Sequence, residues 1–201
     1  MMSAVPFDVR RLGSSDPVRA LSAVAVRGYS SASEAAQAIL GLVHELVGFG
    51  VCVVTRVDLA ANTLTVVEAL DVVGVGITPG LVVPADEMPC DFVVRKATPI
   101  QEYDLDSHPA FQALPARAKL GLRAYIGVPL KRSDGSVWGT LAATDRAVQE
   151  TTEMHLQTLT VLGRLLALEY ERQEQSEALA AHAKALEERL QISEALDEER
   201  V

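Results

Sequence analysis

The stretch from Leu120 to Asp145, LGLRAYIGVPLKRSDGSVWGTLAATD, decides the fold of this chain. Its centre, Ser133-Asp134-Gly135, favours a tight turn, because Asp tolerates left-handed backbone and Gly adopts it without steric cost. Side chains alternate along a strand, so the run before the turn has one apolar face, made of Ala124, Ile126, Val128 and Leu130. We therefore expect two antiparallel strands joined by a tight turn.

The second strand of this hairpin is expected to have two distinct faces. Strict alternation sets one group of side chains against another, with Trp138, Thr140 and Ala142 opposed to Val137, Gly139, Leu141 and Ala143. Pro129, in the first strand, has no N–H to donate, so we expect it at a strand end or beside a β-bulge.

The chain before the hairpin alternates between helical and strand patterns. Asp16-Pro17 predicts the start of a short helix, and Ser31 or Ser33 is expected to cap a second helix that ends near Gly48. The remaining pattern predicts strands at 51–57, 64–70, 80–83 and 100–103, and helices at 84–97 and 115–120.

The composition of the chain excludes several classes of protein. Hydrophobic residues make up 49% of the 201 residues, which is enough for a packed core. Of the net charge of −9, the tail from Leu168 to Val201 carries −6, from ten acidic and four basic residues. The sequence has no cluster of Lys and Arg typical of a nucleic-acid surface, no signal peptide and no membrane-spanning run. We expect a cytoplasmic protein with neither nucleic acid nor membrane as a partner.

The two cysteines, Cys52 and Cys90, are too few for a disulfide framework. Their spacing with His44 or His108 fits no zinc motif, so we expect no metal site. No nucleophile–base pair appears at usable spacing, so we name no catalytic residue and expect no enzyme activity in this chain.

From Thr151 onward the pattern is helical without interruption. One apolar stripe runs along it at about 3.5-residue spacing, through Leu156, Leu159, Leu166, Tyr170, Leu179, Ala183, Leu186 and Leu190. Such a helix is too long to lie on a compact domain of this size, so its end must protrude. A protruding amphipathic helix favours a parallel two-stranded coiled coil. The alternative is a packed helix that ends near Arg172 and a frayed tail.

These patterns divide the chain into three parts. Residues 1–30 form an extension with a short helix, residues 31–172 form one domain, and residues 173–201 form a coiled-coil helix. The chain stops in mid-pattern without a helix stop signal, which favours a fragment whose helix leads to an output domain.

The hairpin resembles the closing hairpin of GAF domains. The residues that match the family's phrase are Gly121, Leu122, Ile126, Gly127, Val128, Pro129, Leu130, Asp134, Gly135, Trp138, Gly139 and Leu141. The segment 87–100, EMPCDFVVRKATPI, resembles the family's helix end through Arg95, Thr98, Pro99 and Ile100, although Ala97 stands where Gly is common. Asp104 and the run His108–Phe111 resemble another family phrase. The resemblance covers roughly Ser31–Arg172.

The resemblance implies an α+β fold related to PAS domains. It implies an antiparallel sheet of five or six strands, with helices on both faces, a ligand cavity under short helices, and a long C-terminal helix. Most members of the family are dimeric sensors that regulate a neighbouring domain. We therefore expect a homodimer held by its terminal helices, with a small molecule or an adjacent output domain as the further partner.

The sequence does not name a cofactor. Cyclic-nucleotide-binding members carry an N-K-x-x-x-F-x-x-x-D-E signature that is not found here. Bilin-binding members use a Cys often followed by His, whereas Cys90 is followed by Asp91. Haem-binding members need an axial His, and His108 lies in the corresponding region but before a proline. Free-methionine-sulfoxide reductases of this fold use several pocket cysteines, and only Cys90 lies in a suitable segment.

Seven residues are candidates for lining a ligand pocket: Cys90, Val94, Tyr103, His108, Phe111, Tyr125 and Trp138. Cys90 is expected near a helix start, which favours a thiolate, but Asp86, Glu87 and Asp91 oppose it. A buried inert thiol and a redox sensor are the two alternatives, and the first is favoured.

The sequence thus favours a small-molecule-sensing or regulatory domain of a bacterial signal-transduction protein. The second hypothesis is a ligand-free dimerisation module whose pocket is plugged by apolar side chains of residues 72–81. The third is a redox enzyme of the free-methionine-sulfoxide-reductase type.

Overall fold

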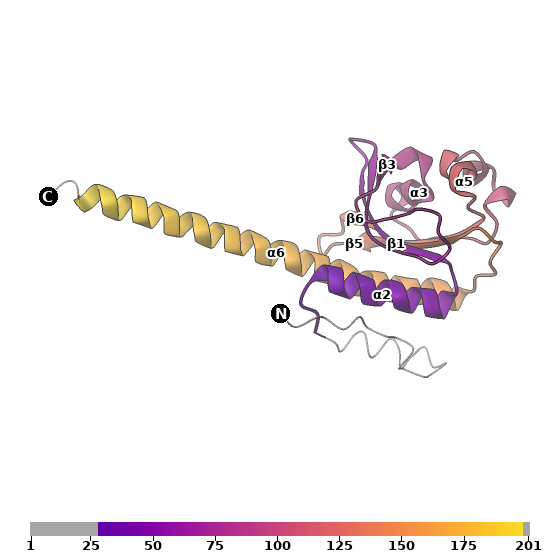
Figure 1. Cartoon of the computed structure of the whole chain (residues 1–201), viewed down its shortest axis with the longest axis horizontal. Helices are drawn as coiled ribbons and strands as arrows, with labels where there is room; N and C mark the ends of the chain where they lie inside the picture. Colours follow the sequence, from indigo (N-terminus) through magenta and orange to yellow (C-terminus); the bar gives the residue numbers. More distant parts are fainter. Residues whose placement is uncertain (1–27, 199–201) are drawn as a thin grey trace.

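A computed structural model describes residues 28–198 and shows an α+β architecture built on one antiparallel sheet (Figure 1). The six strands lie in the order β3-β2-β1-β6-β5-β4. Their bounds are β1 Val51–Asp58, β2 Thr63–Asp71, β3 Val82–Pro84, β4 Ile100–Glu102, β5 Ala124–Lys131 and β6 Val137–Asp145. The predicted fold class and all predicted strands are confirmed, with ends moved by one or two residues.

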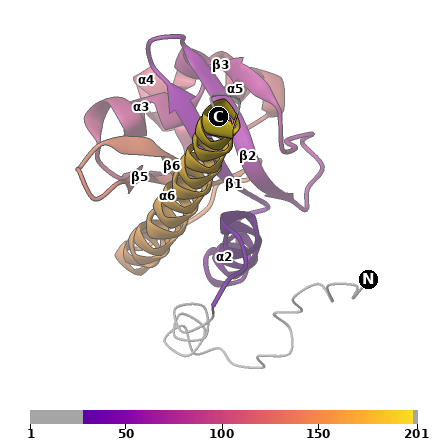
Figure 2. The ribbon, with the colours of Figure 1, turned by 90° about the vertical axis from the view of Figure 1, so that its left-hand side faces the viewer.

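Helices cover both faces of this sheet. Helix α2 (Ala32–Val47) and the start of helix α6 (Glu153–Glu198) lie side by side on one face, which we call the helical face (Figures 1 and 2). Short helices cover the other face, which we call the cavity face: η2 Ala85–Glu87, α3 Pro89–Lys96, η3 Leu105–Ser107, α4 Pro109–Gln112 and α5 Pro115–Leu120. Among residues 28–198, none of the helices is long and apolar enough to cross a membrane.

Helix α2 begins and ends where the sequence signals predict. The Ser31 side chain accepts a hydrogen bond from the backbone N–H of Glu34, which satisfies a free donor at the helix start. Gly48 ends the helix in the left-handed conformation, with φ of 81°. The short helix predicted at Asp16-Pro17 lies outside the described residues.

The β5–β6 hairpin confirms the predicted turn and corrects one face assignment. Gly135 adopts positive φ in the turn, and Ile126, Val128 and Leu130 point into the core of the helical face. Trp138 also lies in that core, although strict alternation would place it with Thr140 on the other face. The register shifts between Leu130 and Lys131, because β6 carries one extra residue there, and this β-bulge reverses the side that Trp138 faces.

The single helix predicted at 84–97 is two helices. Met88 separates η2 from α3 in an extended conformation, with φ of −115° and ψ of 145°. Pro89 explains the break, because its ring disfavours helical backbone in the residue before it and suits the first position of a new helix.

Helix α6 is continuous and extends far beyond the sheet. Its 46 residues span about 69 Å at the 1.5 Å rise per residue of an α-helix. Gln173 accepts a hydrogen bond from the backbone N–H of Ala32, and Glu174 accepts one from Trp138. The side chains described after Glu174 are exposed, so the helix leaves the domain at this point (Figure 1).

Candidate functional site

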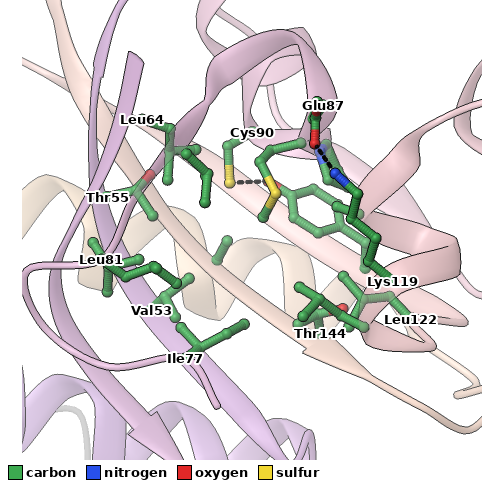
Figure 3. Close-up of a pocket in the computed structure, with 18 of the residues that line it drawn as sticks. Val53, Thr55, Leu64, Ile77, Leu81, Glu87, Cys90, Lys119, Leu122 and Thr144 are labelled. Atoms are coloured by element: carbon green, nitrogen blue, oxygen red, sulfur yellow. Dashed lines mark hydrogen bonds and ion pairs between the residues drawn. The ribbon is translucent and has the colours of Figure 1, made fainter. Parts of the chain in front are cut away.

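A cavity of about 480 Å³ lies between the sheet and the elements of the cavity face (Figure 3). Its floor consists of every second residue of three neighbouring strands, because alternate side chains point to the same side of a sheet. These residues are Val53 and Thr55 from β1, Leu64 and Val66 from β2, and Ala142 and Thr144 from β6. The volume falls within the range of roughly 300–1,000 Å³ that is typical of small-molecule sites.

The hollow exists because the middle of the floor carries small side chains. Thr55, Ala142 and Thr144 are buried in the central strands of the sheet, and their short side chains leave room beneath the covering helices. Opposite them, the cavity is closed by Met88 and Cys90 and by residues of α5 and its C-terminal flank.

The polar groups of the floor and walls are already engaged within the protein. The Thr55 and Thr140 hydroxyls share a hydrogen bond of 2.7 Å, and the Thr144 hydroxyl donates to the carbonyl of Ala124 at 2.7 Å. The Tyr125 hydroxyl donates to Cys90 Sγ at 3.4 Å. The inner wall of the cavity therefore offers a ligand mainly apolar surface.

Burial keeps the two titratable groups of the inner wall, Cys90 and Tyr125, neutral. Burial raises the pKa of the Cys90 thiol. Hydrogen bonds with neighbouring hydroxyls lower this pKa, but by less than burial raises it. Burial also raises the pKa of Tyr125 well above its ordinary value. A thiol held in its protonated form is a weak nucleophile, so this geometry favours a structural role for Cys90.

The loop after β2 forms one side of the cavity and is held by Asp71. The Asp71 carboxylate accepts hydrogen bonds from four backbone N–H groups of residues 74–77, at 2.7 to 3.3 Å. This arrangement turns the loop so that Ile77 and Leu81 face the cavity. Partial burial would raise the pKa of Asp71, but the four backbone donors outweigh it and lower the pKa.

An ion pair stands at one end of the cavity. Lys119 from α5 contacts Glu87 from η2, with Nζ and Oε2 separated by 2.8 Å (Figure 3). The two side chains are 65% and 30% exposed, so both charges remain in contact with water. Among the residues that line the cavity, these two are the charged ones.

The structure brings two of the seven predicted pocket residues into the cavity wall, Cys90 and Tyr125. Val94 and Phe111 are buried on the same side of the sheet but do not line the cavity. Tyr103 is 57% exposed.

His108 is exposed as well. Its Nδ1 accepts a hydrogen bond from the backbone N–H of Ala110 and so caps α4, and its ring packs on Phe111 with centroids 5.0 Å apart. It does not line the cavity.

Trp138 lies on the opposite face of the sheet, at the point where α6 leaves the domain. Its ring stacks on Tyr170 with centroids 4.4 Å apart, and its Nε1 donates to Glu174 at 3.0 Å. Arg132 from the β5–β6 turn donates to both carboxylate oxygens of Glu174, at 3.0 and 3.1 Å. We call Trp138, Tyr170, Glu174 and Arg132 the helix junction.

Most residues that shape the cavity are small or aliphatic, and the seven candidates from the sequence are mainly aromatic or reactive side chains. Val53 and Thr55 line the floor, and the alternation within the predicted strand 51–57 was a signal that could have selected them. The second hypothesis uses Ile77 and Leu81 to plug the cavity, whereas these two residues form a wall beside an open volume. Lys119 carried no signal, because its pairing with Glu87 depends on packing between distant segments.

A second hollow, of about 570 Å³, lies between the β5–β6 turn and α6. It is lined by charged side chains, including Lys131, Arg132 and Arg164. Arg132 is already paired with Glu174, and Ser133 donates to Glu171 at 2.5 Å. This region therefore serves to fix the hairpin to α6.

The cysteines and acidic residues form no metal or redox cluster among residues 28–198. Cys52 is fully buried in the helical face, and burial together with the charge of Asp145 raises its pKa to about 12. The acidic residues near Asp104 are paired with arginines, since Asp104 contacts Arg123 at 2.9 Å and Asp106 contacts Arg117.

Comparison with known proteins agrees with this architecture. The GAF domain of a phosphoenolpyruvate-protein phosphotransferase from Coxiella burnetii superposes with a TM-score of 0.68 at 17% identity, over 81% of this chain and 96% of that chain. The chromophore-binding domain of the bacteriophytochrome RpBphP3 from R. palustris gives 0.67 at 14% identity, over 80% of this chain. The match covers 62% of that bacteriophytochrome chain, and at this identity such likenesses concern the fold.

A third solved structure, the chromophore-binding domain of Stigmatella aurantiaca phytochrome P1, gives a TM-score of 0.59 at 19% identity, over 83% of this chain and 61% of that chain. Among curated protein sequences, none matches the chain. The family model of the GAF domain matches residues 31–170, which include the whole sheet and the cavity. The chain therefore belongs to the GAF domain family.

Proposed function

We propose that this chain is a sensory or regulatory domain of a bacterial signal-transduction protein in the cytoplasm. In this proposal a small molecule binds in the cavity, and its occupancy is passed to a dimeric C-terminal helix. The observation that carries the proposal is an apolar cavity of about 480 Å³ on one face of a sheet whose other face holds α6. We assign no reaction to the cavity, because its cysteine is neutral and lies beside no base.

The sheet offers a short route from the cavity to the helix junction. Thr55 lines the cavity, and the next residue, Arg56, lies over the Trp138 ring at 5.9 Å from its centroid. On β6, Thr140 bonds to Thr55, and only Gly139 separates it from Trp138. A ligand that shifts β1 against β6 would therefore move the helix junction, which holds α6 at the point where it leaves the domain.

The proposed mechanism is a shift between two packings of the domain. A ligand changes such an equilibrium only by the difference in its affinity for the two states. A shift from mostly inactive to mostly active needs a difference of about 5 kcal/mol, so the signal requires a ligand that fits one packing closely.

The dimer is proposed from the free part of α6. Leu179 and Leu186 are seven residues apart and are 71% and 46% exposed. Ala183 lies between them on the same side of the helix, which gives the spacing of a coiled-coil seam. Such a seam needs a second helix to bury it, and the parallel helix of a second copy supplies an identical seam.

The second hypothesis, a ligand-free dimerisation module, is supported less well. It needs the side chains of residues 72–81 to fill the cavity. Val72 and Val73 are 54% and 41% exposed, and the volume beside Ile77 and Leu81 stays open. The reductase alternative is weakened by Cys52, which lies in the core of the other face and cannot join Cys90.

Native mass spectrometry of the purified full chain tests both parts of the proposal. We expect a dimer that carries a bound small molecule or accepts an added one. The variant Leu186→Glu places a charge on the seam and should yield monomers, while Ala181→Glu adds the same charge on the opposite side of the helix and should leave the dimer intact. A monomeric wild-type chain, or equal dimer content in both variants, contradicts the dimer.

A further inference from the structure

We propose that the cavity accepts an apolar monocarboxylate, whose carboxylate replaces Glu87 as the partner of Lys119. This inference rests on the proposed function and names the chemical class of its ligand. The apolar body of the ligand would lie over the strand floor, and its head group would stay at the end of the cavity where Lys119 stands.

The inner wall excludes a charged or highly polar ligand body. The hydroxyls of Thr55, Thr144 and Tyr125 are already hydrogen-bonded to partners within the protein. The other floor residues are Val53, Leu64, Val66 and Ala142, which offer no hydrogen bond through their side chains. A polar group placed there would lose its hydrogen bonds to water without replacement, which is unfavourable, so only an apolar body fits.

The mouth of the cavity, by contrast, presents a charge that can change partner. The pair of Lys119 and Glu87 is solvent-exposed, and exposed ion pairs contribute little net stability. Exchange of one carboxylate for another therefore has a small cost. It leaves Glu87 in contact with water and Lys119 still paired.

The geometry favours a carboxylate over an amine as the ligand head group. Lys119 is the more exposed partner, and its flexible four-carbon arm lets the ammonium follow a bound ligand, whereas Glu87 is shorter and half as exposed. A second cation stands nearby, because Arg146 donates to the carbonyl of Leu120, a cavity-lining residue. Among residues 28–198 Arg146 forms no ion pair, so this end of the cavity carries local positive charge.

Calorimetric titration of the full chain with decanoate, decanol and decylamine tests the proposal. These probes share one hydrocarbon body and differ in head group. We expect decanoate to bind most tightly. Lys119→Gln should weaken decanoate about five-fold, which is the range of one exposed ion pair. Glu87→Gln removes the competing carboxylate and should strengthen decanoate while leaving decanol unchanged.

Lys96→Gln is the matched control, because Lys96 is an exposed lysine on α3 that does not line the cavity. It should leave all three affinities unchanged. Equal binding of decanoate and decanol with no effect of Lys119→Gln, or preferred binding of decylamine, overturns the carboxylate class and leaves the sensory function standing. Failure of all three probes to bind, with folding of each variant verified by circular dichroism, overturns the apolar monocarboxylate. The sensory function is overturned only if native mass spectrometry also finds no small molecule that the chain carries or accepts.

Discussion

The two faces of the sheet use the same strands for opposite purposes. Val54 and Val53 are neighbours on β1, yet Val54 points into the core of the helical face and Val53 points into the cavity. The helical face is filled by large side chains, such as Ile126, Leu130 and Leu141, and holds α2 and α6. The cavity face carries small residues at the same level of the sheet and leaves a hollow. The comparison shows how one sheet can pack tightly against two helices on one face and leave an open volume on the other.

The largest expected loss of stability comes from a substitution between β1 and β6, the two central strands that both faces share. A Cβ added at Gly139 would lie 1.9 Å from the backbone oxygen of Thr55, so Gly139→Ala forces β1 and β6 apart. We expect a loss of roughly 4 kcal/mol in the free energy of unfolding, as for other severe backbone clashes. Urea denaturation followed by circular dichroism measures it.

The control for this variant is Gly135→Ala in the β5–β6 turn. A Cβ there meets open space, and only the φ of 84° opposes it, so the cost should be about 1 kcal/mol. Equal losses for the two variants would show that close contact between β1 and β6 is not what fixes the sheet.

The next prediction compares the two faces directly. Val54→Ala should cost about 2.5 kcal/mol, because it leaves a void in a filled core. Val53→Ala should cost only about 1 kcal/mol, since the side chain already borders an open volume. The same urea titration measures both, and a larger loss for Val53→Ala would contradict the described cavity.

A third prediction concerns a substitution that fills the cavity. Ala142 is buried at the cavity floor, and Ala142→Leu places apolar atoms in the open volume. We expect a gain of about 1 kcal/mol in unfolding free energy and loss of decanoate binding. If the cavity were closed in solution, the added bulk would instead destabilise the protein, by roughly 1–3 kcal/mol. Thermal unfolding with and without decanoate separates these results.

The smallest expected effect concerns the loop that walls the cavity. Asp71→Asn replaces one carboxylate oxygen by an amide nitrogen, so two of the four backbone N–H groups of residues 74–77 lose their acceptor. We expect a cost of about 0.5 kcal/mol and faster exchange of the loop amides with solvent. Amide hydrogen exchange by NMR measures this. Asp58→Asn is the control, since Asp58 holds the β1–β2 turn in a similar way but lies away from the cavity.

We also expect the stability of this loop to depend on pH. The pKa of Asp71 is lowered in the folded protein, so the carboxylate stabilises the fold fully above the pKa of the unfolded chain. This contribution is lost as the pH falls through the lowered, folded pKa. Loop protection in the wild type should therefore decline in acid, whereas in Asp71→Asn it should be low and independent of pH across the same range.

The sequence predicted the elements of the fold and missed most of the cavity, for one physical reason. Turn chemistry at Gly135, capping at Ser31 and alternation in β5 are local effects, so they could be read from neighbouring residues. The side that Trp138 faces depends on a β-bulge between two strands, which alternation in one strand does not reveal. The ion pair of Lys119 and Glu87 joins segments 32 residues apart and has no sequence signature.

We propose that a ligand bound in the cavity changes the packing of the helix junction on the other face of the sheet. Trp138 is the one tryptophan of the chain, so its fluorescence reports on the junction alone. Titration with decanoate should change the Trp138 emission with the midpoint of calorimetric binding, and Ala142→Leu should abolish both signals. Saturable binding in the cavity with unchanged Trp138 emission would contradict the claim.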